Sequence, residues 1–365
     1  MKPFELHVPQ ADLDDLDDRL ARTRWPDEMA DAGPGYGLPQ PRLRELAEYW
    51  RHGYDWRKQE AEFNAHPQFV TEIDGQRIHF LHVRSANPDA LPLILTHGFP
   101  GSIAEFLDVI EPLSGAFHLV IPSIPGFGYS SPSGAGGWDT GGWDTGGWDT
   151  HRVARAWATL MARLGYQRYG AQGGDWGSPI SRLVGHYDAE HVVGVHLNYL
   201  PTPVPPDAQL SASDQERADQ IQHYLAHQPG FRALQASTPR TVGHLLTDSP
   251  VAQLAWIAER FADWSGPDTP VDVDRQLTDV MLYWLTRTAG SAARLHKESP
   301  LGPLPCPVPI GVAVYPHDLT RSIRSIAEKT YRIAHWSEFD RGGHFAALEV
   351  PTVFAADVQK FFQSL

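Results

Sequence analysis

Cysteine is nearly missing from this sequence, because Cys306 is the only one among 365 residues. No internal disulfide can form, and a reducing compartment is the simplest interpretation. The sequence also lacks any run close to the roughly 18 apolar residues that span a bilayer, and residues 1–7 lack the apolar core of a signal peptide. These absences predict a cytoplasmic protein and argue against a membrane protein.

Positive charge is scarce as well, since 30 Lys and Arg stand against 44 Asp and Glu and give a net charge of -14 at pH 7. Without a basic stripe to neutralise phosphates, we expect no nucleic-acid or anionic-membrane partner. The 18 histidines show no convincing metal-ligand spacing. His79 and His82, for example, fall on opposite faces of a strand-like run. We therefore expect neither a metal nor another cofactor.

Helical patterns dominate the first 70 residues. The segment 12–22 places Leu13, Leu16 and Leu20 on one helix face, and Trp25-Pro26 ends that pattern. A second helical candidate covers residues 43–50. We interpret residues 1–70 as a helical arm packed on a larger body.

From residue 69 the sequence alternates between strand and helix signals. Residues 69–73 and 77–83 predict a β-hairpin around an Asp-Gly turn. Further strand and helix candidates follow in alternation at residues 93–96, 103–113, 119–121, 153–164, 169–172, 179–187 and 191–199. This alternation predicts an α/β fold with a mostly parallel sheet and helices on both faces.

Strand signals disappear between residues 202 and 303. Proline-rich turns and helical patterns such as 251–261 and 277–285 predict a helical lid there. Strands return at 308–314 and 333–339, and a closing helix is expected at 351–362. We therefore divide the chain into an arm (1–70), a core in two parts (71–201 and 304–365) and a lid (202–303).

Three tandem copies of Gly-Gly-Trp-Asp-Thr occupy residues 136–150. A period of five residues is far too short for a solenoid unit. We favour a local duplication in an exposed loop. The alternative is a flap in which Trp138, Trp143 and Trp148 contact a partner or cover a substrate.

The segment Gly173-Gly174-Asp175-Trp176-Gly177 lies between a predicted strand and a predicted helix. Small residues around a nucleophile permit the strained strand-to-helix turn of the α/β-hydrolase fold. Such a turn exposes the Asp175 side chain at the carboxyl end of the sheet. It also directs the backbone N–H of Trp176 at the reacting oxygen. Asp175 is therefore the candidate nucleophile.

Three further features complete this pattern. His97-Gly98-Phe99-Pro100 follows an apolar strand, where the fold places its second oxyanion donor, here the Phe99 N–H. His344 follows the last strand, and Asp318 follows the strand before it. The chain order nucleophile, acid, histidine is the order of this fold. Asp340 is nearer to His344 in sequence, but we expect a strand and turn to point it elsewhere.

A carboxylate nucleophile restricts the substrate. Attack on an ester carbonyl would give an anhydride with no evident advantage, whereas attack on a saturated carbon gives an alkyl ester on Asp175. His344 can then direct water at the ester carbonyl while the N–H groups of Phe99 and Trp176 hold the oxyanion. Epoxides and alkyl halides are the two obvious electrophiles.

With these residues identified, the chain resembles the microsomal-type epoxide hydrolases, including the insect juvenile-hormone enzymes and bacterial relatives. The resemblance runs along nearly the whole chain. It is carried by the segments His97 to Pro100, Gln172 to Ser178 and Arg341 to Ala347. It implies that Asp175 is the nucleophile, His344 the base and Asp318 its acid partner.

The lid departs from that family. Two lid tyrosines of the family hydrogen-bond the epoxide oxygen and help it leave as an alcohol. The matching positions of this chain carry Phe231 and His296. A phenylalanine cannot donate a hydrogen bond, whereas a histidine can, and as an imidazolium it would be the stronger acid.

Three interpretations remain open. His296, with nearby Tyr224 or Tyr283, replaces the tyrosine pair in a working epoxide hydrolase that forms a vicinal diol. Alternatively, the enzyme acts on another electrophile such as a halide, for which Trp176 could supply an N–H donor. In the third interpretation, the protein is a relative of these enzymes that binds a ligand without hydrolysing it.

The intact set of Asp175, Asp318 and His344 argues against the third interpretation, and we favour the first, in detoxification or secondary metabolism. The bulk of Trp176, Phe231 and Trp284 indicates a small apolar substrate, which an aromatic ring would suit.

Overall fold

The computed structural model describes residues 1–28, 34–130, 147–227, 229–299, 302 and 304–365. Trp138 and Trp143 of the first two repeats lie outside these residues. The third repeat is not an exposed loop, because Trp148 is buried and its backbone N–H donates to the Glu298 carboxylate at 3.0 Å. The guanidinium of Arg152 lies 4.3 Å from the centre of the Trp148 ring.

A single sheet carries the fold, and its strand order is β1-β2-β3-β5-β4-β6-β7-β8-β9 among the described residues. The strands are β1 (Lys2–Phe4), β2 (Gln68–Ile73), β3 (Gln76–Val83), β4 (Leu91–Thr96), β5 (Phe117–Pro122), β6 (Tyr169–Gly173), β7 (Val192–Leu197), β8 (Ile310–Val314) and β9 (Ile333–Glu338). From β5 to β9 every pairing is parallel, whereas β1, β2, β3 and β5 pair antiparallel. The predicted α/β-hydrolase fold with a mostly parallel sheet is confirmed.

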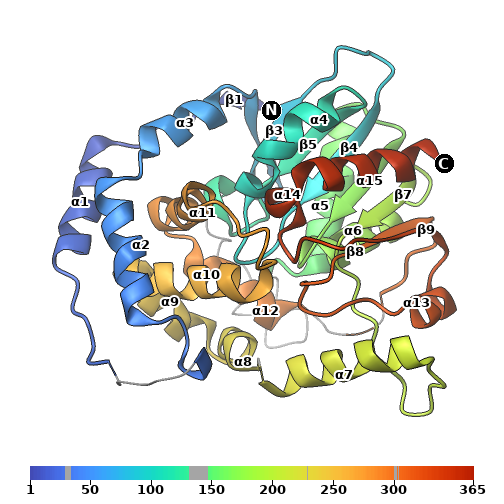
Figure 1. The fold of residues 1–365 in the computed structure, drawn as a ribbon. Coiled ribbons are helices and arrows are strands. Elements are labelled where there is room, and N and C mark those ends of the chain that lie inside the picture. The colour runs from blue at the N-terminus through green and yellow to red at the C-terminus, as the bar shows by residue number, and fades with distance from the viewer. Residues whose placement is uncertain (29–33, 131–146, 228, 300–301, 303) are drawn as a thin grey trace, which may run out of the picture.

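Helices cover both faces of the sheet (Figure 1). Helices α5 (Thr150–Arg163) and α6 (Gly177–Tyr187) pack together on one face, and α4 (Leu107–Ser114) packs with α15 (Pro351–Gln363) on the other. Phe361 and Phe362 of α15 lie where side chains at Gly170, Gly194 and Gly311 would otherwise stand. Glycines in three neighbouring strands therefore let this helix approach the sheet closely.

The single helix expected at 103–113 is divided in two. Ser102 caps a short 3-10 turn, η2 (Ile103–Phe106), by accepting a hydrogen bond from the Ala104 N–H at 3.1 Å. Helix α4 then follows from Leu107. The division places the side chains of η2 at the carboxyl end of β4.

The first 70 residues form α1 (Gln10–Ala21), α2 (Gln40–His52) and α3 (Trp56–Asn64), with the turn η1 (Pro34–Tyr36). The two helices expected here are present. Strand β1 was not expected, because three residues carry no usable alternation, and it pairs with β2 at the edge of the sheet. Helices α1 and α2 lie beside α10 (Figure 1). Arg275 of the neighbouring helix α11 bonds Glu62 of α3 at 2.6 Å.

A run of helices between β7 and β8, which we call the insertion, stands over the carboxyl end of the sheet (Figure 1). It contains α7 (Ala212–His227), α8 (Pro229–Ser237), α9 (Pro239–Asp248), α10 (Pro250–Trp264), α11 (Val273–Thr286) and α12 (Ala289–Glu298). Pro239 and Pro250 stand in the first turns of their helices, where a missing N–H costs nothing. The predicted segments 251–261 and 277–285 fall within α10 and α11.

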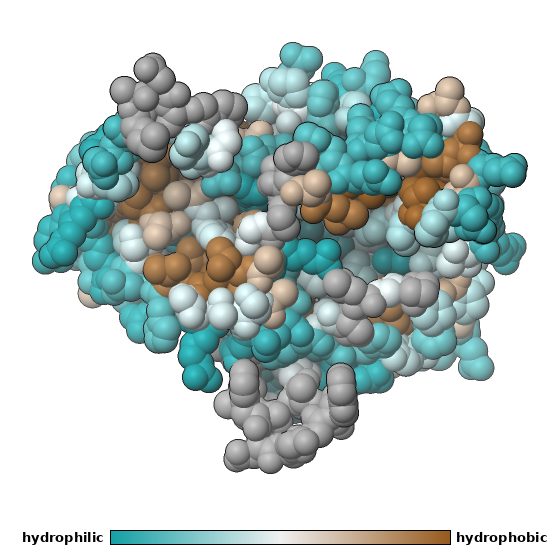
Figure 2. Space-filling view, turned by 90° about the horizontal axis from the view of Figure 1, so that it is seen from below, coloured by the Kyte–Doolittle hydropathy of each residue, from teal (hydrophilic) through white to brown (hydrophobic). Residues whose placement is uncertain are grey.

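Helix α13 (Arg324–Thr330) follows β8, and α14 (Ala346–Glu349) precedes α15, while the turn η3 (Gly128–Ser130) follows β5. None of the helices in the described part of the chain is long and apolar enough to cross a bilayer. Several large apolar side chains of the insertion do reach the surface, namely Leu225, Leu234 and Leu245. Figure 2 shows apolar patches bordered by hydrophilic side chains on the underside of the molecule.

Candidate active site

Asp175 occupies a strained turn between β6 and α6. Its φ angle is +43°, a left-handed value that few non-glycine residues adopt. A side chain at Gly173 would meet the backbone of Gly177, and one at Gly177 would meet the Thr96 carbonyl. Glycine is therefore required on both sides of the turn. The expected strained strand-to-helix turn is present, and it places the Asp175 carboxylate at the carboxyl end of the sheet.

Asp175, His344 and Asp318 meet at this end of the sheet. The Nδ1 atom of His344 lies 2.6 Å from Oδ1 of Asp318, and its Nε2 atom lies 3.3 Å from Oδ2 of Asp175. Asp318 follows β8 and His344 follows β9, so parallel strands bring the two loops together. Asp340 is exposed, and the acid that contacts His344 is Asp318.

Backbone contacts hold the His344 loop in place. The His344 N–H donates to the Trp264 carbonyl at 2.8 Å, at the end of α10. Its carbonyl accepts a hydrogen bond from Nδ2 of Asn198 at 3.4 Å, just after β7. The imidazole is thus held between the insertion and the core, and its side chain is only 2% exposed.

Two backbone N–H groups face the Asp175 carboxylate. The Phe99 N–H donates to Oδ1 of Asp175 at 2.8 Å, and the Trp176 N–H also bonds the carboxylate and lowers its pKa. A side chain at Gly98 would collide with that carboxylate, so glycine leaves room for it. The two predicted oxyanion donors are therefore close to the carboxyl group on which the oxyanion would form.

Charge couples the three side chains. Burial alone would raise the pKa of Asp175, but the hydrogen bond and charge of His344 outweigh burial and lower it. Burial alone would lower the pKa of His344, but Asp318 and Asp175 outweigh it and raise this pKa to about 10. Burial raises the pKa of Asp318, and His344 opposes the shift. In the free protein His344 is therefore an imidazolium between two carboxylates.

Aromatic side chains enclose the insertion side of Asp175. The Phe231 ring on α8 lies 5.8 Å from the Phe99 ring and 5.0 Å from the Trp256 ring. His296 on α12 lies 5.6 Å from the Phe99 ring and 4.9 Å from the Trp176 ring. The structure thus brings Phe231 and His296, the two lid positions that differ from the family pattern, together beside Phe99. Their surroundings are mostly aromatic, although the guanidinium of Arg260 lies 5.1 Å from the centre of the Phe231 ring.

His296 is a neutral acceptor in this arrangement. The indole N–H of Trp176 donates to its Nε2 atom at 3.3 Å, so the imidazole proton is on Nδ1. Burial lowers the pKa of His296 to about 4, although the charge of Asp175 partly opposes this. The imidazolium considered from the sequence is therefore not the form present at neutral pH. Trp176 likewise has its indole N–H engaged.

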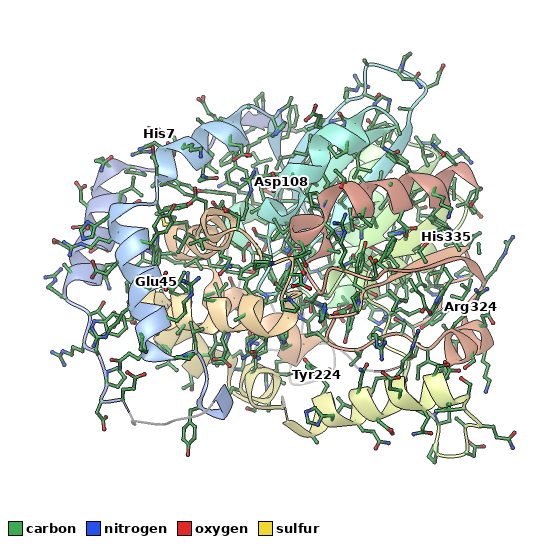
Figure 3. The ribbon with its side chains drawn as sticks, in the orientation of Figure 1. His7, Glu45, Asp108, Tyr224, Arg324 and His335 are labelled. Carbon is green, nitrogen blue, oxygen red and sulfur yellow. The ribbon has the colours of Figure 1, made fainter. Side chains whose placement is uncertain are left out.

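The tyrosines differ in their availability. Tyr283 donates its hydroxyl to the Gly101 carbonyl at 2.6 Å and is fully buried. Tyr224 lies near the end of α7 beside α8 (Figure 3). Burial and then the charge of Asp175 raise its pKa to about 12. Tyr199, which the sequence did not single out, has its ring 5.5 Å from that of His344.

A cavity of about 10 Å³ lies beside Asp175. It is lined by Phe99, Gly101, Glu105, Gly174, Asp175, Asn198, His344 and Phe345. Glu105 was missed from the sequence, although it stands only eight positions after His97 in the loop that carries Phe99. A carboxylate so close to an oxyanion-hole motif is the signal that could have identified it.

A larger groove of about 880 Å³ lies elsewhere, between α1, α9 and α12. Its lining includes Trp284, which we had expected at the substrate pocket, but none of Asp175, Asp318 and His344. Trp284 therefore does not contribute to the candidate site. In the described part of the chain, no cluster of three or more His, Cys, Asp or Glu side chains is arranged to hold a metal ion.

Comparison with known families agrees with this geometry. Residues 1–106 match the family model of the epoxide hydrolase N terminus, and residues 92–267 match that of the α/β hydrolase fold. The chain is similar to a protein of Stigmatella aurantiaca that is provisionally named an epoxide hydrolase. The two are 41% identical over 100% of this chain and 85% of that protein.

Other relatives are similar along the same length. Epoxide hydrolase 1 of Sus scrofa is 31% identical over 99% of this chain and 88% of its own. The crystal structure of juvenile hormone epoxide hydrolase from the silkworm Bombyx mori has a TM-score of 0.88 and 29% identity, and the match covers 99% of this chain and 94% of that one. Because relatives that are 41% and 31% identical match 100% and 99% of its length, the chain belongs to the microsomal-type, or juvenile-hormone-type, epoxide hydrolase family.

Proposed function

We propose that this protein hydrolyses an epoxide to a vicinal diol through an alkyl ester on Asp175. One observation carries the proposal. The Asp175 carboxylate stands on the elbow with Oδ1 on the Phe99 N–H at 2.8 Å and Oδ2 facing His344 at 3.3 Å. One oxygen is thus in the oxyanion hole, and the other, which pairs with His344, is the one that attacks in the proposed first step.

In the first step, Oδ2 of Asp175 attacks an epoxide carbon. The new carbon–oxygen bond forms as the ring carbon–oxygen bond breaks, and the ring oxygen takes a proton. In the second step, water gives a proton to Nε2 of His344, and its oxygen attacks the ester carbonyl of Asp175. The N–H groups of Phe99 and Trp176 stabilise the oxyanion, which collapses to the diol and the free carboxylate.

The charge coupling supports this order of events. In the free protein, Asp175 and Asp318 keep His344 protonated. Ester formation removes the negative charge of Asp175, so the pKa of His344 falls. The Nε2 proton of His344 then replaces the proton that the donor gave to the ring oxygen, and the neutral imidazole becomes available as a base. Asp318, at 2.6 Å from Nδ1, then holds the tautomer in which Nε2 accepts a proton.

The ring oxygen needs a proton donor, and we assign this role to Tyr224. His296 accepts a hydrogen bond from Trp176 and is neutral, and Phe231 has no polar atom. Tyr283 is engaged with the Gly101 carbonyl. Tyr224 remains protonated at neutral pH and is close enough to Asp175 for that charge to act on its pKa.

Small apolar epoxides suit the site. We treat the insertion, residues 202–303, as a lid whose Phe231, Trp256 and His296 contact the substrate. Their rings form a continuous aromatic wall with Phe99, and such walls favour aryl or alkyl groups.

The halide alternative has less support. Halide release depends on N–H donors at the site, and the indole N–H of Trp176 already bonds His296. A non-hydrolytic binding role would not require Asp318 to orient His344, yet their contact is 2.6 Å.

A trapping experiment tests the proposed function. A panel of aryl and alkyl epoxides and short haloalkanes is assayed with the wild-type protein for diol and for halide, and each compound is then incubated with His344→Gln. We expect diol without halide, and a peptide containing Asp175 that is heavier by the mass of the intact epoxide. Asp175→Asn should remain unmodified. Release of halide supports the alternative, and no product or ester from any compound contradicts both.

A further inference from the structure

Glu105 is a carboxyl group at the site for which the two steps above give no role. It lies on η2, and its carboxyl group turns back over Gly101. A side chain at position 101 would occupy the place of that carboxyl group, just as one at Gly98 would occupy the place of the Asp175 carboxylate. Two glycines of the same loop therefore make room for two acids that face one cavity.

This cavity lies on the core side of Asp175. Its lining comes from the loop after β4, the elbow, the end of β7 and the His344 loop, and it contains no residue of α7 to α12. The substrate, by contrast, must contact the insertion, where Phe231 and His296 stand. At about 10 Å³ the cavity has room for roughly one water molecule and for no part of an organic substrate.

The polar groups around the cavity are suited to a water that will react. His344 stands on one side with Nε2 directed at Asp175, and Glu105 stands on another. Asn198 completes the lining, but its amide is engaged with the Gln172 side chain and the His344 carbonyl. The Glu105 carboxyl group accepts from the backbone of Gly98, and its second oxygen can still orient a water beside the base.

Burial favours the neutral, protonated form of Glu105. Burial raises its pKa to about 8, and the charge of Asp175 adds to this while His344 opposes it. Two side chains of α11, Asp279 and Tyr283, also lie close enough to interact electrostatically with Glu105. Asp279 is itself a buried acid, and burial raises its pKa well above the ordinary value. A neutral carboxyl group offers a carbonyl oxygen as acceptor without placing a third negative charge beside Asp175 and Asp318.

We propose that Glu105 holds the hydrolytic water in this cavity. The inference rests on the proposed function and adds a role in its second step. The water donates one hydrogen to Nε2 of His344 and the other to the carbonyl oxygen of Glu105, so a lone pair faces the carbonyl carbon of the Asp175 ester. The first proton then moves to His344 as the new carbon–oxygen bond forms, and Glu105 keeps its own proton throughout.

Separate measurement of the two steps tests this role. The epoxide that alkylates the wild-type protein is mixed rapidly with wild type, Glu105→Leu and Glu105→Gln, and the ester on Asp175 is followed by quenched-flow mass spectrometry. Glu105→Leu should form the ester at the wild-type rate and hydrolyse it about tenfold or more slowly, so alkylated protein accumulates. Glu105→Gln keeps a carbonyl acceptor and should hydrolyse the ester within about threefold of wild type.

Glu111→Leu is the matched control, because it makes the same replacement on the solvent side of α4. It should change neither step. An unchanged rate of ester formation shows that a variant is folded, and Glu105→Met, which keeps the side-chain length, replaces Glu105→Leu if that variant does not fold. Ester hydrolysis at the wild-type rate in Glu105→Leu overturns the inference alone. Absence of any ester in wild type overturns the proposed function and the inference with it.

Discussion

The indole N–H of Trp176 donates to Nε2 of His296 at 3.3 Å, which joins the residue after the nucleophile to the last helix of the insertion. This bond places the imidazole proton of His296 on Nδ1, at a lid position where the family resemblance implies a phenol. His296 is an acceptor with a pKa of about 4. Under the proposed function, ring opening would use a different proton donor, and this has consequences that can be measured.

Replacing His296 by tyrosine should speed ester formation. A phenol at this position can accept from Trp176 and still donate its own proton to the ring oxygen. We expect His296→Tyr to raise the rate of ester formation on the order of tenfold, with ester hydrolysis unchanged. Rapid-quench kinetics measure both rates. A slower first step would show that the histidine itself assists ring opening.

Removal of the Tyr224 hydroxyl should have the opposite effect on the same step. The phenol stays protonated because burial and the charge of Asp175 raise its pKa to about 12. Tyr224→Phe should slow ester formation roughly 10- to 100-fold and leave ester hydrolysis intact. Tyr187→Phe is a matched control, because Tyr187 is the exposed last residue of α6. Equal ester formation in wild type and Tyr224→Phe would exclude the phenol as the proton donor.

Asp318 should matter most in the second step. Asp318→Asn keeps the shape of the side chain but disfavours the tautomer in which Nε2 of His344 accepts a proton. We expect ester hydrolysis to fall by roughly 10²- to 10⁴-fold, with a smaller effect on ester formation. The ester should then be visible in steady state by mass spectrometry. Asp340→Asn is the control, since Asp340 is exposed.

The pKa of His344 should depend on the charge of Asp175. Asp318 and Asp175 raise it to about 10 in the free protein, so Asp175→Asn should lower it by removing one of the two carboxylates. A ¹⁵N NMR titration of labelled histidine measures the shift. A His344 pKa that is the same in wild type and Asp175→Asn would contradict the coupling.

The same shift affects stability. A group whose pKa is higher in the folded protein stabilises it fully below the unfolded value, about 6.5 for histidine, and this contribution is lost as pH rises through the folded value. For His344 the loss falls between about pH 6.5 and about 10. In Asp175→Asn the free energy of unfolding should fall less over this range, as urea titrations at several pH values would show.

A methyl group at Gly177 should destabilise the fold. Its Cβ atom would meet the Thr96 carbonyl, which belongs to a central strand and cannot give way. We expect Gly177→Ala to lower the free energy of unfolding by about 1–3 kcal/mol. Gly115→Ala is the control, because φ there is -66° and a Cβ atom would meet nothing. Urea denaturation followed by tryptophan fluorescence compares the two.

Local motifs made much of the site predictable. The elbow around Asp175 and the turn after His97 depend on glycines within a few positions, so their spacing is visible in the sequence. The pairing of Asp318 with His344 also followed, because parallel strands bring successive loops to one edge. What the sequence did not reveal depends on neighbours that are far apart in the chain.

Three cases show this limit. The proposed role of Glu105 depends on a cavity lined by Asn198 and His344. The neutral state of His296 depends on its burial, and its tautomer depends on an indole 120 residues away. Trp284 has the bulk of a pocket residue but packs toward the outer groove. Composition and periodicity contain no information about such contacts, because burial and charge act through space.

The third Gly-Gly-Trp-Asp-Thr copy makes contacts that stabilise the fold. Trp148 is buried, and the Asp149 side chain caps α5 by accepting a hydrogen bond from the Arg152 N–H at 2.8 Å. Because the copies are identical, loss or gain of one unit regenerates the same five residues immediately before α5. A slippage event during DNA replication would therefore leave the Trp148 and Asp149 contacts in place. Natural variants with different copy numbers are expected to keep the same catalytic geometry.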